Sequence, residues 1–172
     1  MYRSGHTGLA CIVVSPFVVL FGLWLGIIWT LPVILGGVFA ARIPDKDREP
    51  PLNLVVTHRG ATHTLIAALI SALLAVGIIV FAFNLLTGGR DGFTPSQGRL
   101  ILTVFIGVFG GYLSHLFGDA LTKSGINPFW PLSDREVRVA GLHSSSTLWN
   151  RIFLICGVSS LSVAVVIVGA LA

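Results

Sequence analysis

The chain has 172 residues, of which 54% are hydrophobic and only 10% are charged. Soluble domains carry charge on roughly a quarter of their residues, so this composition indicates an integral membrane protein. The net charge is +4, but the 11 lysines and arginines form no basic run and lie between apolar segments. That distribution is typical of membrane orientation signals and excludes nucleic acid as a partner.

Four apolar stretches follow one another, at residues 9–41, 65–86, 100–117 and 152–172. The last three each match one spanning helix of ~20 residues. The first would reach ~50 Å as a single helix, against a hydrocarbon core of ~30 Å. We therefore predict two helices there, joined by a turn near residues 22–26. The expected fold is an all-α bundle of about five transmembrane helices in a single domain, residues 1–172.

This topology sorts the connecting segments onto two sides of the membrane. One side holds residues 1–7, 42–62 and 119–150, with most of the cations. The other side has only Arg90 and Arg99. The positive-inside rule makes the first side cytoplasmic. We expect a multi-pass protein of the cell (inner or plasma) membrane, with its N-terminus inside and its C-terminus outside. All five histidines then fall at the cytoplasmic end.

The fourth predicted helix ends with His115 and Asp119, which are four residues apart. That spacing places both side chains on one helix face, where an imidazole and a carboxylate can hold one divalent ion. Thr122 continues the same face. The alternative is a polar helix end that faces water and holds no metal.

The segment His58-Arg59-Gly60-Ala61-Thr62-His63 precedes the third predicted helix. Gly60 indicates a turn that can bring both imidazoles to one point, and Thr62 is the expected N-cap. Arg59 adds a positive charge suited to phosphate. The alternative is an ordinary basic loop at the membrane interface.

Asp45 and Asp47 flank Lys46 just after the second predicted helix. In an extended segment, residues two apart point the same way, so we expect both carboxylates to converge on one cation. The alternative is a solvated charge cluster with internal ion pairs.

Taken together, these motifs predict a metal centre at the cytoplasmic end of the bundle. Imidazole and carboxylate ligands suit zinc first, with manganese or iron as alternatives, and the donors suffice for two ions. The candidate ligands are His6, Asp45, Asp47, His58, His63, His115 and Asp119. The candidate substrate-binding residues are Arg48, Thr62, Thr122 and Lys123, and the predicted catalytic residues are Asp47 or Asp119 as general base and Arg59 as charge stabiliser.

Two further segments follow the fourth predicted helix. Residues 123–132 contain a glycine and two prolines, so we expect a loop over the site, with Phe129 and Trp130 in the head-group layer. His143 precedes the last helix and is a weaker candidate ligand.

Residues 58–65 (HRGATHTL) and 111–132 (GYLSHLFGDALTKSGINPFWPL), together with His6 and residues 44–47, resemble the membrane-bound metal-dependent hydrolases. That bacterial and archaeal family is distantly similar to zinc-dependent phospholipase C and to the zinc-dependent single-strand nucleases. The resemblance implies a helical membrane protein with a metal-hydrolase site built from the same seven ligands. Two positions depart from the family pattern: Arg48 stands where relatives often carry His, and Asn150 where some carry Glu.

The sequence therefore predicts a hydrolase that cleaves a phosphoester, with a phospholipid head group as the candidate substrate. Two other functions stay open. A metal-ion transporter needs ligands near the middle of the bilayer, whereas these cluster at one boundary. A non-catalytic scaffold stabilised by metal fits the same residues. The sequence specifies the bilayer as a partner but leaves the oligomeric state open.

Overall fold

The computed structural model describes residues 1–50, 60–88 and 93–171. Its helices are α1 (Arg3–Leu25), α2 (Thr30–Ala40), α3 (Leu65–Thr87), α4 (Pro95–Ala120) and α5 (Thr147–Leu171), with short 3₁₀ helices η1 (Ile27–Trp29), η2 (Pro44–Arg48) and η4 (Ala61–His63). The described residues contain no strand beyond two isolated bridges. The all-α prediction is confirmed, and five helical segments are long and apolar enough to cross a membrane.

The predicted division of the first apolar stretch into two helices is confirmed. α1 ends at Leu25, and Gly26 follows with a φ of 100°, which an L-residue with a side chain rarely adopts. The Gly26 amide donates to the carbonyl of Gly22 at 3.0 Å, which closes the last turn of α1. The chain then reverses, and α2 continues into η2 as the second candidate span, Ile27–Arg48.

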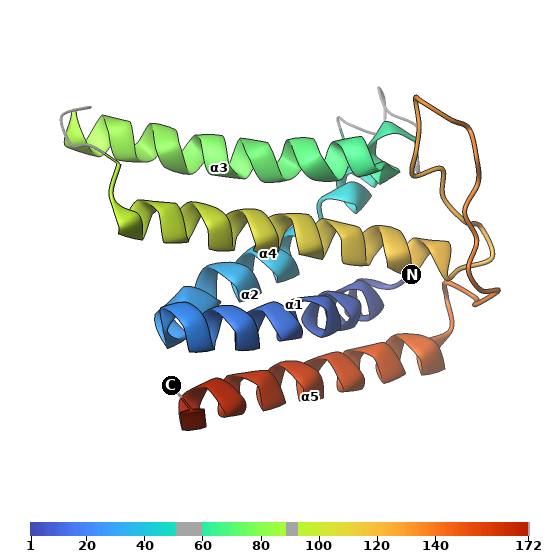
Figure 1. Cartoon of the computed structure of the whole chain (residues 1–172). Coiled ribbons are helices and arrows are strands. Elements are labelled where there is room, and N and C mark those ends of the chain that lie inside the picture. Colours follow the sequence, from blue (N-terminus) through green and yellow to red (C-terminus); the bar gives the residue numbers. More distant parts are fainter. Residues whose placement is uncertain (51–59, 89–92, 172) are drawn as a thin grey trace.

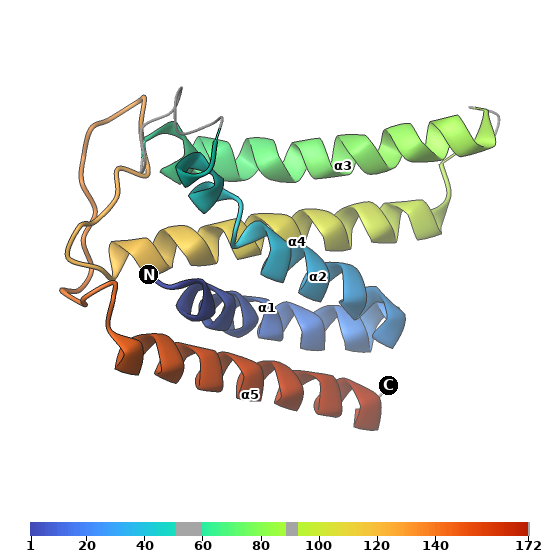
Figure 2. The same ribbon diagram turned by 180° about the vertical axis from the view of Figure 1, so that it is seen from behind.

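The five helices lie side by side, with α1 and α4 in the middle and α3 and α5 at the two flanks (Figures 1 and 2). α1 packs against α5, α2 against α4, and α3 against α4. The two ends of the chain lie at opposite ends of the bundle (Figure 1). An odd number of spans produces that arrangement, so it agrees with the five-span topology.

Glycines set the distance between the packed helices. A Cβ atom on Gly157 of α5 would lie 2.1 Å from the carbonyl oxygen of Gly8 in α1. A Cβ on Gly111 of α4 would lie equally close, 2.1 Å, to the carbonyl oxygen of Gly37 in α2. Because lipid gives no hydrophobic drive for helix association, small residues that allow close backbone packing hold such bundles together.

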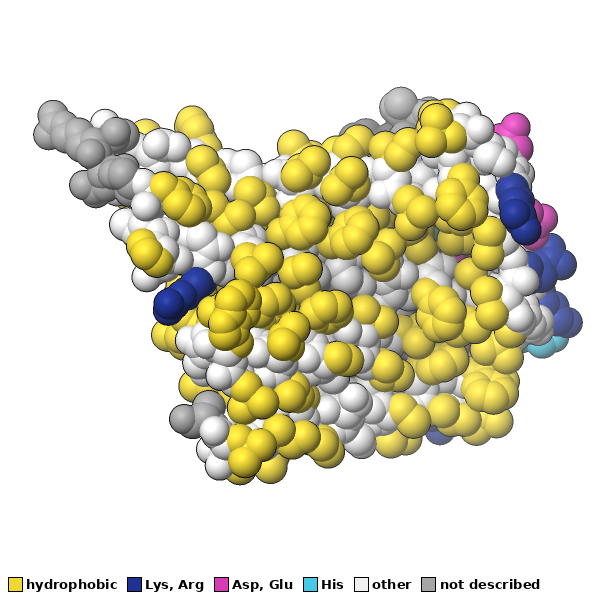
Figure 3. Space-filling view, in the orientation of Figure 1, with side chains coloured by type: hydrophobic (Ala, Val, Ile, Leu, Met, Phe, Trp, Pro, Cys, Tyr) yellow, Lys and Arg dark blue, Asp and Glu magenta, His cyan; other side chains and the backbone are white. Residues whose placement is uncertain are grey.

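The two flanking helices expose apolar side chains along their length. Ile78 and Phe81 of α3 are 68% and 69% exposed, and Val166 of α5 is 69% exposed. Yellow apolar surface covers the side of the bundle in Figure 3, whereas lysine and arginine gather at the end that carries the N-terminus. Such a surface is stable in lipid and would aggregate in water, so the molecule is a multi-pass membrane protein.

The long connection between α4 and α5 closes the charged end of the bundle. Ile126 is buried against Ala68 and Tyr112, and the carbonyl of Pro128 accepts a hydrogen bond from the Leu65 amide at 2.9 Å. Phe129, next in the chain, is 44% exposed. The loop is therefore fastened to the start of α3 while it presents an aromatic side chain outward.

Candidate metal centre

Three buried side chains from two separate parts of the chain meet at the charged end of the bundle. The Nε2 atoms of His63 and His115 lie 3.3 Å apart, and the Oδ2 atom of Asp119 lies 3.4 Å from the first and 3.6 Å from the second. Atoms bound to one tetrahedral zinc ion at ~2.0–2.2 Å lie ~3.3–3.6 Å from one another. The triangle thus has the dimensions of three ligands around one ion.

Local structure explains why these three side chains converge. His115 and Asp119 stand one turn apart on α4, as their spacing predicts, and both are fully buried. His63 ends the short helix η4, directly before α3. The prediction that Thr62 caps α3 is wrong: the Thr64 hydroxyl accepts from the Ala67 amide at 3.1 Å. Thr62 is therefore available to contact the site.

The second ring nitrogen of His115 fixes its tautomer. Nδ1 lies 2.8 Å from the backbone carbonyl of Ala41, and a carbonyl only accepts. Nδ1 therefore carries the hydrogen, and in the neutral ring Nε2 presents its lone pair to the triangle. A ring nitrogen held this way by a backbone carbonyl is the usual support of a metal-bound histidine.

His63 is oriented in the same manner by polar neighbours. The Thr62 hydroxyl donates to Oδ2 of Asp47 at 2.6 Å, so its oxygen accepts from Nδ1 of His63 at 3.0 Å. The Asp47 carboxylate also lies 3.5 Å from that nitrogen. Burial lowers the pKa of His63 below its ordinary value, against the opposing effect of Asp119. The ring is thus kept neutral, with its Nε2 lone pair toward the triangle.

These assignments leave two nitrogen lone pairs and one carboxylate oxygen facing one another in a buried space. A divalent cation among the three atoms would stabilise such an arrangement. The donor set and its geometry therefore fit a divalent metal ion.

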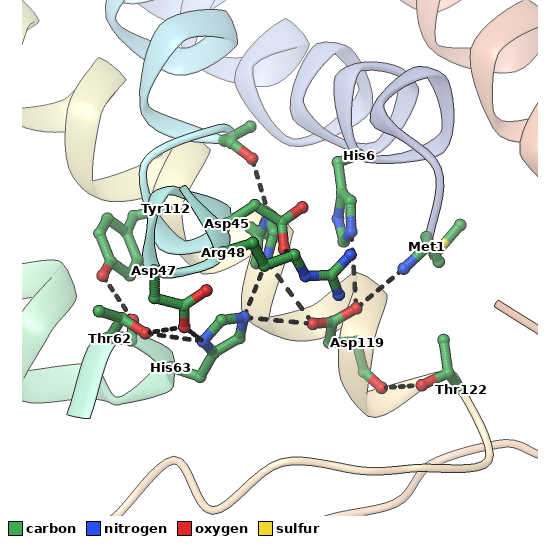
Figure 4. Close-up of polar contacts among 12 residues, drawn as sticks. Met1, His6, Asp45, Asp47, Arg48, Thr62, His63, Tyr112, Asp119 and Thr122 are labelled. Atoms are coloured by element: carbon green, nitrogen blue, oxygen red, sulfur yellow. Dashed lines mark hydrogen bonds and ion pairs between the residues drawn. The ribbon is translucent and has the colours of Figure 1, made fainter. Parts of the chain in front are cut away.

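His6 of α1 extends the cluster on the other side of Asp119 (Figure 4). Its ring stacks on His115 with centroids 3.8 Å apart, and its Nε2 lies 3.5 Å from Oδ1 of Asp119. The amino group of Met1 also lies 3.1 Å from that oxygen. Among the described residues, neither ring nitrogen of His6 finds a hydrogen-bond partner, although the residue is 1% exposed. Ligand atoms of His6, Asp45 and His115 all lie within 4.8 Å of one another, as in a second, overlapping group.

The expected convergence of Asp45 and Asp47 is wrong, because the segment is not extended. Both residues lie in the 3₁₀ helix η2, where residues two apart point in different directions. Asp47 is buried and turns to Thr62 and His63. Asp45 forms an ion pair with Arg48 at 3.4 Å and turns toward His6. The two carboxylates thus belong to opposite sides of the cluster.

Other predicted residues lie elsewhere or outside the described part of the chain. His58 and Arg59 fall among residues 51–59, which the structure does not describe. Thr122 is buried, but its hydroxyl donates to the backbone carbonyl of Asp119 at 2.8 Å, away from the cluster (Figure 4). Lys123 and His143 are exposed and belong to neither ligand group.

Three residues that support the site were not identified from the sequence. The Ala41 carbonyl holds the ring of His115, and the Tyr112 hydroxyl donates to the Thr62 carbonyl at 2.5 Å. Asn150 is 1% exposed; it accepts from the Tyr2 amide at 2.9 Å and donates to the Ser146 carbonyl at 2.7 Å. The sequence singled out Asn150 only as a departure from the family pattern. It ties the start of α1 to the start of α5, so at this position the chain has a structural amide.

Fold and site together define a multi-pass helical membrane protein with a buried histidine–aspartate cluster at one end of its bundle. The model of the YdjM inner membrane protein family matches residues 1–172, and the chain belongs to that family. The molecule is accordingly an inner-membrane protein. No curated protein and no solved structure matches it.

Proposed function

We propose that this protein is a metal-dependent hydrolase that cleaves a phosphoester at the cytoplasmic face of the inner membrane. The observation that carries the proposal is the triangle of His63, His115 and Asp119, whose ligand spacing suits a tetrahedral ion. Zinc is the preferred metal, because manganese and iron more often take octahedral sites in which neighbouring ligands lie closer together.

A bound divalent ion would supply Lewis acidity, which lowers the pKa of a water molecule and polarises a phosphoryl oxygen. The residues of the chain would hold that ion and orient its ligands. Asp47 and Thr62 fix the tautomer of His63, and the Ala41 carbonyl fixes that of His115. In the overall reaction the water oxygen bonds to phosphorus, the phosphorus–oxygen bond to the alcohol breaks, and the alcohol leaves with a proton.

The role of His6 and Asp45, which belong to the second ligand group, depends on how many ions bind. Asp119 presents Oδ2 to His63 and His115 and Oδ1 to His6, so it could contribute a ligand atom to either group. With two ions, His6 and Asp45 would be ligands. With one ion, they lie beside the triangle, and either could accept the proton of the attacking water. Asp47 and Asp119, the bases predicted from the sequence, stay candidates for the same step.

The test is hydrolysis by purified protein loaded in turn with zinc, manganese and iron. The substrates are aryl phosphate monoesters and diesters and a panel of phospholipids, with His115→Ala as the control. We expect metal-dependent release of product from at least one phosphoester, lost in the variant. Protein that holds stoichiometric metal and cleaves none of these compounds would contradict the proposal.

One observation favours a second function, a scaffold stabilised by metal. The three residues of the triangle are each 0% exposed, and structural metal sites are closed in this way. A chelator would then lower the melting temperature of the protein, while metal-loaded protein stays inactive on every substrate.

A further inference from the structure

A pocket of about 320 Å³ opens beside the cluster, between the start of α1 and the segment that joins α2 to η2. His6 and Asp45, which belong to the second ligand group, line it. A volume of this size suits a small polar head group rather than a whole lipid. The pocket therefore connects the surface of the molecule with the near side of the candidate metal centre.

The rim of this pocket is cationic. Arg3, Arg42 and Lys46 line it, against the carboxylates of Asp45 and Glu49, so the lining carries a net positive charge before any metal is bound. Arg42 is exposed and forms no ion pair with a described residue. Arginine presents several donors in a plane that matches phosphate oxygens. A rim of this composition suits an anion with phosphate-like geometry.

Glu49 occupies the position that such an anion would take. Its carboxylate lies 3.3 Å from the guanidinium of Arg3 and 2.7 Å from the Lys46 amine. The side chain of Arg3 is 81% exposed and that of Lys46 57%, and ion pairs so exposed are weak. Arg3 and Glu49 also line an adjoining hollow of about 230 Å³. A phosphate group that displaces Glu49 would gain both cations and the space of both hollows.

The remaining wall of the pocket is apolar and exposed. Phe39, in the last turn of α2, is 64% exposed, and Ile43 is 41% exposed. Both residues line the same pocket as the cations and lie in the second half of the candidate span Ile27–Arg48. A ligand with acyl chains could lay them over these side chains while its phosphate reaches the rim. Basic pockets between spanning helices bind the head groups of anionic lipids in this manner.

We propose that this pocket binds the phosphate head group of an anionic phospholipid through Arg3, Arg42 and Lys46, with Glu49 as the group that the phosphate displaces. The inference rests on the proposed function, because the pocket is the route by which the substrate reaches the cluster. Net positive charge at the rim disfavours head groups that carry their own cation. The substrate class is therefore an anionic lipid, in preference to a zwitterionic lipid or a soluble phosphate.

The experiment measures binding to metal-free protein in detergent with a chelator present, so that no hydrolysis is required. The probes, titrated by calorimetry, are dihexanoyl phosphatidic acid, dihexanoyl phosphatidylcholine and glycerol 3-phosphate. We expect phosphatidic acid to bind at least tenfold more tightly than either other compound. Arg42→Gln should weaken its binding about tenfold, and Glu49→Gln should bind it at least as tightly as wild type. Arg138→Gln, which removes a paired cation outside the pocket, is the matched control and should change nothing.

Equal binding of phosphatidic acid by wild type and Arg42→Gln would overturn the proposal, and so would weaker binding by Glu49→Gln. Glycerol 3-phosphate that binds as tightly as phosphatidic acid would overturn the lipid assignment and indicate a soluble phosphate ligand. Selective lipid binding by a protein that never hydrolyses a phosphoester would uphold the pocket and refute the hydrolase. Hydrolysis of a phosphoester without selective lipid binding would uphold the hydrolase and refute the pocket.

Discussion

The Nε2 atoms of His63 and His115 lie 3.3 Å apart, although 52 positions separate the two residues in the chain. Each ring has its other nitrogen engaged, one by Thr62 and the other by the carbonyl of Ala41. The two lone pairs therefore point at one space, which they share with the Asp119 carboxylate. A cation in that space would remove the repulsion among the three atoms, and this requirement makes the cluster testable without knowledge of a substrate.

Replacement of either histidine by alanine should abolish metal binding at the triangle. We expect elemental analysis of purified His63→Ala and His115→Ala to find the bound metal reduced at least tenfold if one ion binds, and by at least one equivalent if two bind, because each variant lacks one of three ligands. His143→Ala is the matched control, since His143 is an exposed histidine at the same end of the molecule. Metal content at the wild-type level in both cluster variants would rule out the shared site.

Asp45 and Asp47 should behave differently, because they lie on opposite sides of the cluster. If two ions bind, Asp45→Asn should lower the metal content from two ions to one, since Asp45 belongs to the second ligand group. Asp47→Asn should keep the number of ions but weaken their affinity about 10–100-fold, as loss of a carboxylate that orients a histidine does. Titration with a metal-sensitive dye against each variant measures both quantities. An Asp47→Asn protein that loses one whole ion would instead make Asp47 a direct ligand.

The stability of the metal-free protein should fall below pH 6.5, and His63 should be one cause. Burial lowers the pKa of His63 in the folded state. Below pH 6.5 the unfolded chain binds a proton that the folded protein does not, so the free energy of unfolding decreases as pH falls. The decrease is at most ~1.4 kcal/mol per pH unit for one group.

His63→Asn lacks this proton-binding group. Melting temperatures in a chelator between pH 7.5 and 5.0 should therefore fall less steeply for His63→Asn than for wild type. Parallel curves for the two proteins would show that His63 takes up no proton on unfolding in this range.

The sequence predicted the fold well because the constraints of a bilayer are simple. The ~30 Å thickness of the hydrocarbon core required a break in residues 9–41, and Gly26 provides it. The spacing of His115 and Asp119 was equally reliable, since both stand on one long helix whose periodicity is fixed.

The sequence could not give the conformation of the short segments between spans. Asp45 and Asp47 are two positions apart in the sequence, and that spacing does not distinguish a strand from a 3₁₀ helix. Only the tertiary packing of the segment selects the 3₁₀ helix η2. Thr62 and Thr64 are both plausible caps by residue type, and the choice between them depends on where α3 begins. The hydrogen bond between the Ala41 carbonyl and His115 could not be predicted, because every residue has a backbone carbonyl and the sequence does not show which one contacts a side chain.

The orientation of the protein in the membrane stays a prediction, and fusions to a reporter enzyme can measure it. The end of the bundle that carries the N-terminus also gathers lysine and arginine (Figure 3). Arg99, near the start of α4, lies at the other end (Figure 1), 6.0 Å from the ring of Trp29. The positive-inside rule then places the metal centre in the cytoplasm and residue 172 outside. Alkaline phosphatase, which needs disulfides and so an oxidising compartment, should be active when fused after Ala172 and inactive when fused after Arg138. The reverse pattern would put the candidate site outside.

Close packing of α1 on α5 should make Gly157 intolerant of even one methyl group. A Cβ atom there would meet the carbonyl oxygen of Gly8 at 2.1 Å, and backbone on both sides cannot move aside without separation of the helices. We expect Gly157→Ala to cost about 1–3 kcal/mol of stability, as overpacking does.

Gly169→Ala is the matched control on the same helix, where a Cβ meets nothing within 4 Å. Melting temperatures in detergent should fall for the first variant and hold or rise slightly for the second, because alanine favours helix over glycine. Because Tyr2 and Asn150 join the same two helices beside His6, the first variant should also bind metal less tightly. Unchanged stability in Gly157→Ala would mean that α1 and α5 are not held at the distance seen in the structure.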